Sequence, residues 1–234
     1  MRISLDTPTA RLFLAASVVM AIVSGAANIA ALEDPTTESA RQLALHAATV
    51  PCLVFALIAS AFAASSERRF HLADQRLLAD PSRVRWLAGK AAVSTGIGAV
   101  YGAIGALTAI AVARLAFTAR DVEFDLTDGS VLRSLIGVVL AAATFSAIGG
   151  AVGALTTNTP MIVALLLAWV LVVEPPTVLG VPAFGRLLPA AGALALTRSP
   201  DPDLLPPVWG GVSMTVFLLV ALWFAQRRLR RADL

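Results

Sequence analysis

The fold is decided by residues 134–173, SLIGVVLAAATFSAIGGAVGALTTNTPMIVALLLAWVLVV, which contain no Asp, Glu, Lys or Arg. A helix needs about 20 mainly apolar residues to cross a bilayer core, so this stretch is long enough to cross twice. The polar residues 156–160, Thr-Thr-Asn-Thr-Pro, divide it, and proline suits the first turn of a new helix. We therefore expect two membrane helices, over about 131–155 and 160–175, joined by a tight turn.

The rest of the chain repeats this pattern. Charge-poor stretches predict four further membrane helices, over about 12–32, 43–65, 90–115 and 207–226. Across the 234 residues 58% are hydrophobic and only 14% are charged, whereas soluble domains carry roughly 25% charged residues. We predict an all-α integral membrane protein, in which residues 1–234 form a single transmembrane domain of six helices.

The positions of the basic residues predict the orientation in the membrane. Twelve of the 18 lysines and arginines fall in the N-terminal tail, the loop 67–90 and the C-terminal tail. Short loops rich in Lys and Arg stay in the cytoplasm, so we expect both ends of the chain inside (N-in/C-in). The arginines at 227, 228, 230 and 231 then face anionic lipid. A nucleic-acid partner is not expected, because this tail is short and has no aromatic partner.

Two connecting segments differ from simple loops. The loop 67–90 is the only sizeable cytoplasmic element, and its residues 67–79 can form a short helix that Asp80-Pro81 would stop. The outer segment 176–206 alternates Pro and Gly with apolar residues. A solvated loop would be more polar, so we expect a re-entrant outer hairpin whose irregular backbone needs protein neighbours.

Motifs for catalysis or metal binding are absent from the sequence. There is no Walker A sequence, no Gly-x-Ser-x-Gly and no His-Glu-x-x-His. His46 and His71 are predicted on opposite sides of the membrane, and the only cysteine, Cys52, fits a small packing residue. We expect no catalytic, cofactor-binding or metal site in this chain.

No charged residue falls in the middle of a predicted membrane helix, and Glu174, at the outer end of the fifth, is the closest to an exception. The simpler interpretation is a helix-end carboxylate at the interface, because charge inside a bilayer is costly. The functional interpretation is an outer gate in which Glu174 pairs with Arg186 or Arg198.

Four glycines recur at four-residue spacing, Gly98 and Gly102 in the third predicted helix and Gly149 and Gly153 in the fourth. Such faces allow two helix backbones to approach closely. We interpret them as helix-packing positions, either within the chain or between two copies in a dimer.

The loop after the second predicted helix carries residues in a recognisable order. Glu67 and Arg69 open it, Leu78, Pro81 and Arg83 form a turn, and Lys90 enters the third helix. This order resembles the cytoplasmic loop of bacterial ABC-transporter permeases of the type-2 exporter class. The resemblance extends to residues 124–128, 149–158, 171–175 and 188–191. It departs from the family at His71-Leu72, where Gly-Thr is usual, and in the ten residues before Arg11, which leave little room for an interfacial helix.

The resemblance implies a permease subunit of an ATP-driven exporter in the bacterial cytoplasmic membrane. A second permease subunit, identical or a sister, would pair with it, and a separate ABC ATPase would bind ATP and Mg²⁺ and dock on the loop. The coupling residues it implies are Glu67, Arg69, Asp74, Pro81 and Arg83. The alternatives are a small membrane carrier that does not use ATP and a membrane assembly or sensor component.

Overall fold

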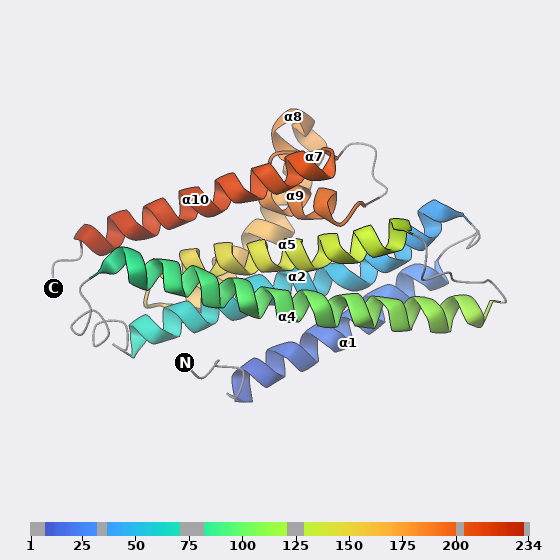
Figure 1. Cartoon of the computed structure of the whole chain (residues 1–234), viewed down its shortest axis with the longest axis horizontal. Helices are drawn as coiled ribbons and strands as arrows, with labels where there is room; N and C mark the ends of the chain where they lie inside the picture. The colour runs from blue at the N-terminus through green and yellow to red at the C-terminus, as the bar shows by residue number, and fades with distance from the viewer. Residues whose placement is uncertain (1–7, 32–36, 71–81, 121–128, 200–203, 232–234) are drawn as a thin grey trace.

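The computed structural model describes residues 8–31, 37–70, 82–120, 129–199 and 204–231, which contain helices and no β-strand. Six of its helical segments are long and apolar enough to cross a membrane, and they lie side by side in an elongated bundle (Figure 1). For the described residues, the expectation of an all-α protein with six helices long and apolar enough to cross a membrane is confirmed.

The helices are longer than their charge-free stretches. Their bounds are α1 Pro8–Ala30, α2 Glu38–Arg69, α4 Arg83–Thr118, α5 Gly129–Gly153, α6 Thr159–Ala168, η2 Trp169–Val173, α7 Glu174–Gly180, α8 Pro182–Gly185, α9 Pro189–Leu196 and α10 Pro207–Arg231. The fifth span is α6, the π-helical turn η2 and α7 in succession. Because charged residues continue α2 and begin α4, the connection between them is shorter than the expected loop 67–90. The short helix expected within 67–79 falls mainly on residues 71–79, which lie outside the described residues.

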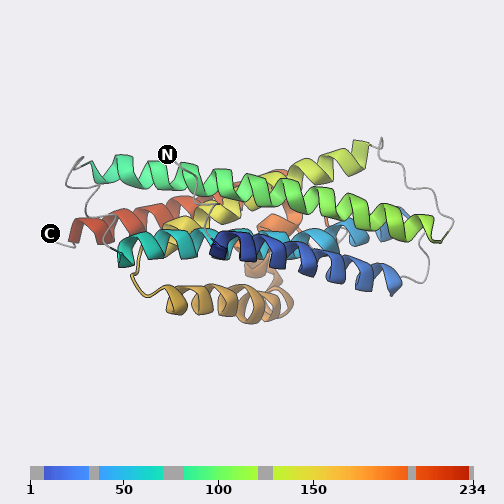
Figure 2. The same ribbon diagram turned by 90° about the horizontal axis from the view of Figure 1, so that it is seen from below.

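α5 is central to the bundle, because it contacts α2, α4, α6, α9 and α10. α1 packs instead against α2 and α4 (Figure 2). In the most apolar window of α5, 61% of the residues are buried, against 22% in the windows of α1 and of the fifth span. The largest core cluster joins α5 to α2, α6, α9 and α10 through residues such as Leu57, Phe145, Leu166 and Met214. A peripheral helix therefore leaves most of its surface for lipid.

Glycines set the distance between α5 and its neighbours. A Cβ atom at Gly98 or Gly102 of α4 would overlap the α5 backbone, and one at Gly149 or Gly153 would overlap the α2 carbonyl groups of Leu57 and Ala61. All four predicted packing glycines are buried within the chain. They serve contacts between helices of one molecule and are not exposed to a second copy.

Hydroxyl groups join the same three helices at the centre of the bundle. The hydroxyls of Ser60 on α2 and Ser146 on α5 are hydrogen-bonded to each other. Ser146 Oγ also donates to the Ser94 carbonyl of α4 at 2.6 Å. A hydroxyl that finds its partner on a neighbouring helix is stabilising in lipid, where no water competes.

The fifth and sixth spans are joined by α8 and α9, which fold back along the bundle (Figure 1). α9 is short but well buried, with Ala191, Gly192, Ala193 and Ala195 all inside. It contacts α5, where Gly137 faces the Leu196 carbonyl, and α10, where Gly192 faces Gly210. These contacts cover a non-membrane-spanning segment with protein on two sides.

The outer surface of the bundle is apolar. Large hydrophobic side chains are more than half exposed on α1, on α4, on the fifth span and on α10, among them Leu12, Leu107, Met161, Leu171, Leu219 and Phe224. Contiguous apolar exposure on this scale is unfavourable in water and is the surface that a lipid-facing bundle requires.

The glycine contacts predict opposite effects for one substitution at two sites of α4. We expect Gly98→Ala to lower stability by about 1–3 kcal/mol, because its Cβ has no room against α5. Gly96→Ala should leave stability unchanged or raise it by up to about 1 kcal/mol, because nothing lies within 4 Å of the added Cβ. Thermal unfolding of both purified variants in one detergent measures the difference. Equal loss at both sites would contradict the proposed packing.

Candidate functional site

The features that concentrate polar chemistry lie at one end of the bundle, where α2 ends and α4 begins. We call this the loop end; the α5–α6 turn and the C-terminal part of α10 lie at the same end (Figure 1). Lys90 Nζ of α4 lies 2.5 Å from Glu67 Oε1 of α2. Lys90 is only 9% exposed, and a buried ammonium is tolerated when a carboxylate compensates it. The ion pair fixes the two helix ends relative to each other.

A second set of contacts ties α2 to the α5–α6 turn. Arg68 Nη1 donates to the Ala154 carbonyl at 2.6 Å. Ser65 lies about one turn before Arg68 on α2, and its Oγ donates to Thr159 Oγ1 at 3.1 Å. The Ala154 carbonyl lies just after the end of α5, where intrahelical partners run out, so the arginine supplies a donor that the helix lacks.

The α5–α6 turn is built by its own polar residues. Asn158 Oδ1 accepts from the Met161 amide at 3.2 Å and caps α6. The Asn158 amide donates to Thr156 Oγ1 at 3.0 Å. Pro160 stands in the first turn of α6, where a missing N–H costs nothing. The predicted turn is therefore present, and hydrogen bonds account for Thr156 and Asn158 in it.

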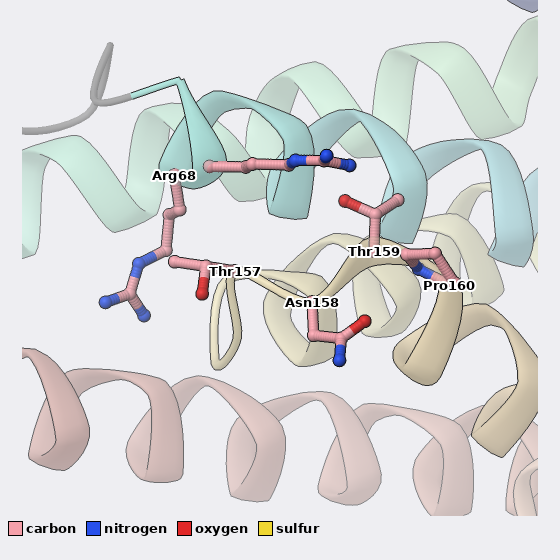
Figure 3. A pocket seen from close by; sticks show the side chains of 6 residues that line it. Arg68, Thr157, Asn158, Thr159 and Pro160 are labelled. Atoms are coloured by element: carbon pink, nitrogen blue, oxygen red, sulfur yellow. The ribbon is translucent and has the colours of Figure 1, made fainter.

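Between α2 and this turn lies a cavity of about 540 Å³, which we call the basic cavity. Figure 3 shows its lining: Arg68, Arg69, Thr157, Asn158, Thr159 and Pro160. The two guanidinium groups, two hydroxyls and the Asn158 amide all offer hydrogen-bond donors. No carboxylate is among these lining residues.

The predicted coupling residues are only partly described. Glu67 and Arg69 lie on the last turn of α2, and Arg83 is the first residue of α4. The Arg69 guanidinium lies 6.0 Å from the centre of the Phe70 ring. Asp74 and Pro81 lie outside the described residues. The structure therefore brings Glu67 and Arg69 together at the loop end and pairs Glu67 with Lys90.

Glu174 is buried, only 2% exposed, where the fifth span changes from η2 to α7. The π-helical turn from Trp169 to Val173 widens the helix, and the Glu174 amide donates to the Trp169 carbonyl five residues earlier. The same widening places the Trp169 indole beside the carboxylate, where Nε1 donates to Glu174 Oε1 at 2.7 Å.

The second Glu174 oxygen connects the fifth span to α9. Oε2 accepts from the Ala190 amide in the first turn of α9 at 2.8 Å. That amide is one of the donors that a helix start leaves unsatisfied, and negative charge is favourable there. The functional interpretation named Arg186 or Arg198 as its partner, whereas the hydrogen bonds of the carboxylate go to Trp169 and Ala190. Glu174 is thus the cap that holds α9 against the fifth span.

Beside Glu174, an apolar cavity of about 400 Å³ lies between the fifth span and α10, with a floor from α2 and α5. Its lining includes Leu57, Phe145, Trp169, Pro189 and Phe217, and Glu174 is the only ionisable residue in it. The cavity suits aliphatic material and offers no donor set for a charged ligand.

Two functional features could not be found from sequence patterns. Trp169 and Glu174 are five residues apart, a spacing that does not share a face of an α-helix. Arg68 and Thr157 are 89 positions apart, and only the packing of α5 against α2 joins them in one cavity. The sequence marked only the neighbourhood of each feature: the double proline after Glu174 indicated an irregular helix end, and the polar residues 156–160 indicated a turn.

The described residues contain no group of three or more His, Cys, Asp or Glu side chains placed to hold a metal ion. Comparisons with protein-family models, with curated proteins and with solved structures found no match to this chain. Its function must therefore be argued from its own residues.

Breaking the Glu67–Lys90 pair should destabilise the loop end. We expect Lys90→Met to lower stability by about 2 kcal/mol, because it leaves a carboxylate partly buried without its cation. The charge-reversed pair Glu67→Lys with Lys90→Glu should recover part of that loss. Thermal unfolding and amide exchange over the last turn of α2 measure both. A reversed pair no more stable than Lys90→Met would argue against a direct interaction.

Glu174→Gln should lower stability by about 1–2 kcal/mol, because one oxygen becomes an NH₂ group facing an N–H donor. Trp169→Phe removes one of those donors, so the double variant should lose less than the sum of the two single losses. Unfolding midpoints of the four proteins give the coupling. Strict additivity would show that Trp169 and Glu174 do not interact.

Proposed function

We propose that the chain is the membrane-spanning permease subunit of an ATP-driven ABC exporter of the type-2 class. The observation that carries the proposal is the Glu67–Lys90 ion pair, at 2.5 Å. The ion pair joins Glu67 and Lys90, the first and last residues of the loop on which the family resemblance mainly rests. The six membrane-spanning helices and the absence of any catalytic motif are consistent with a subunit that contains no enzyme site.

The proposed orientation places the loop end in the cytoplasm. The loop end gathers the C-terminal part of α2, the start of α4 and the C-terminal part of α10 (Figure 1), which carry Arg68, Arg69, Arg85, Lys90 and Arg228. Basic residues concentrate on the cytoplasmic side of membrane proteins. This supports the N-in/C-in topology in the cytoplasmic membrane of a bacterium.

The proposed mechanism uses α2 and α4 as levers. A separate ATPase subunit binds ATP and Mg²⁺, docks on residues 67–83, and pushes on them when it closes. Both helices rest on α5 through contacts that leave no space for a Cβ, so a push at the loop end moves packed helices as units. α4 has 36 residues, about 54 Å at 1.5 Å per residue, so its far end lies well beyond a 30 Å bilayer core.

At the opposite half of the bundle we propose that α7, α8 and α9 form the re-entrant outer hairpin. The α9 part of this segment packs against α5 and α10, as irregular structure at membrane depth requires, and α8 packs against α7. In this proposal Glu174 keeps the hairpin closed by capping α9, and release of that cap opens the outer side. A second permease subunit completes the pathway against the lipid-exposed spans, since the packing glycines are used within the chain.

The test is co-purification from the native host. We expect a nucleotide-binding subunit to co-elute with the tagged wild-type chain in mild detergent, and to be lost from the variant Asp74→Ala with Arg83→Ala. Both substitutions remove charges that a partner surface would recognise. Identification of co-eluting proteins by mass spectrometry, with size-exclusion chromatography to verify folding, gives the readout.

The matched control is Arg114→Ala, which removes an exposed charge near the opposite end of α4 and should leave the ATPase bound. An intact wild-type preparation without any ATPase would favour a carrier or an assembly component. An ATPase retained by the loop variant would move the docking site away from the loop.

A further inference from the structure

We propose that the basic cavity binds a phosphate group, supplied by the headgroup of an anionic phospholipid or by a dissolved phosphate compound. The cavity lies between the last turn of α2 and the α5–α6 turn, and its volume of about 540 Å³ exceeds what one such group needs. This inference does not depend on transport or on an ATPase partner.

The described residues that line the basic cavity are rich in hydrogen-bond donors, and none of them is acidic. Arg68 and Arg69 contribute two guanidinium groups, whose forked N–H geometry matches phosphate oxygens. Thr157 contributes a hydroxyl. Asn158 uses its Oδ1 to cap α6, so its amide NH₂ is the part that remains to donate. A neutral or cationic ligand would find few acceptors here, whereas a phosphate accepts from every side.

Glu67 is adjacent to Arg68 in the chain but is not among the residues that line the cavity. Its Oε1 pairs with Lys90 on α4. The two charged side chains in the described lining, Arg68 and Arg69, are both cationic. Among the described residues, no carboxylate forms an ion pair with Arg69. A phosphate would supply that counter-charge through charge-assisted hydrogen bonds.

The cavity is held in shape before any ligand arrives. Arg68 is anchored on the Ala154 carbonyl at 2.6 Å, and Ser65 holds Thr159 at 3.1 Å. The α6 N-terminus also points its dipole toward this turn, and anions are favourable at that end of a helix. A preformed donor set loses less entropy on binding.

The surroundings of the cavity favour a lipid as the source of the phosphate. Pro160 lines the cavity and lies in the first turn of α6. Two apolar side chains on the outer face of that helix, Met161 and Leu165, are 62% and 55% exposed. A headgroup in the basic cavity would leave its acyl chains beside this exposed apolar face. The cationic side chains in the basic cavity match the phosphate of an anionic phospholipid, and the exposed apolar face of α6 matches its acyl chains.

The experiment uses the full chain, delipidated in detergent and titrated with phosphatidylglycerol or phosphatidylcholine of identical acyl chains. Native mass spectrometry counts the bound lipids. We expect tighter binding of phosphatidylglycerol, and at least about tenfold weaker binding in Arg69→Gln, since hydrogen bonds to charged groups contribute about 1.5–3 kcal/mol. Thr157→Val should weaken binding in the same direction without changing the charge.

The matched control is Arg228→Gln, which removes one exposed arginine from the loop end outside the cavity lining. Preferential binding lost at Arg69 and Thr157 but kept at Arg228 would support the site. Equal weakening at Arg69 and Arg228, with no effect at Thr157, would show only general attraction to a basic surface and would overturn the proposal. Unchanged binding of phosphatidylglycerol to the double variant Arg69→Gln/Thr157→Val would overturn the proposal too, provided that thermal unfolding shows the variant to be folded.

Dissolved phosphate is distinguished in the same preparation. Inorganic phosphate and ATP are added separately at increasing concentration, with sodium sulfate and sodium chloride at matched ionic strength. Saturable stabilisation by phosphate or ATP that disappears in Arg69→Gln, without preference for phosphatidylglycerol, would assign the cavity to a soluble phosphate compound. Displacement of phosphatidylglycerol by sodium chloride as effectively as by phosphate would reject a specific site.

Discussion

The close approach of α5 to α2 and α4 is the contact on which the rest of the structure depends. In a bilayer no hydrophobic force drives apolar helices together, because lipid chains are as apolar as leucine. Association must come from tight packing, and here glycines bring backbone against backbone. Gly149 and Gly153 of α5 lie against α2, and Gly98 and Gly102 of α4 lie against α5. The Ser60–Ser146–Ser94 hydroxyls add polar contacts at the same level.

That packing also builds the loop end. With α5 held against α2, the end of α5 comes within reach of Arg68, and the α5–α6 turn faces the last turn of α2. With α4 held against α5, Lys90 reaches Glu67. The ion pair and the basic cavity thus both involve the last turn of α2. Its consecutive side chains differ in their contacts: Glu67 pairs with Lys90, Arg68 donates to the Ala154 carbonyl, and Arg69 lies near the Phe70 ring. A helix end with such contacts is suited to transmit force or to sense a bound anion.

The other half of the bundle is organised by a single buried carboxylate. The π-helical turn η2 interrupts the fifth span, and its extra residue per turn lets Trp169 and Glu174 meet. Glu174 in turn caps α9, which is short and rests on α5 and α10. Short helices between membrane spans are stable only when their ends are satisfied by protein, because lipid offers no hydrogen bonds.

The number of spans and the turn at 156–160 could be predicted from residue types, whereas the helix ends could not. Six spans were predictable because a bilayer demands about 20 apolar residues in succession, and the break at 156–160 was predictable because Asn158 and Pro160 are suited to starting a helix. The ends of α2 and α4 were placed too far inward, since Glu67, Arg68, Arg69 and Arg85 continue the helices. Charge ends a membrane-embedded stretch but does not end a helix, whose hydrogen bonds are internal to the segment.

The sequence by itself determined the all-helical class, the number of spans and the four close-packing glycines, because each depends on length, hydropathy or side-chain size along one segment. Only the tertiary structure decided that these glycines act within the chain, that Glu174 meets Trp169 and Ala190 rather than an arginine, and that Arg68 and Thr157 line one cavity. These are contacts between residues distant in the chain or out of α-helical phase. Such contacts are fixed by how whole helices pack, which no local pattern of residues specifies.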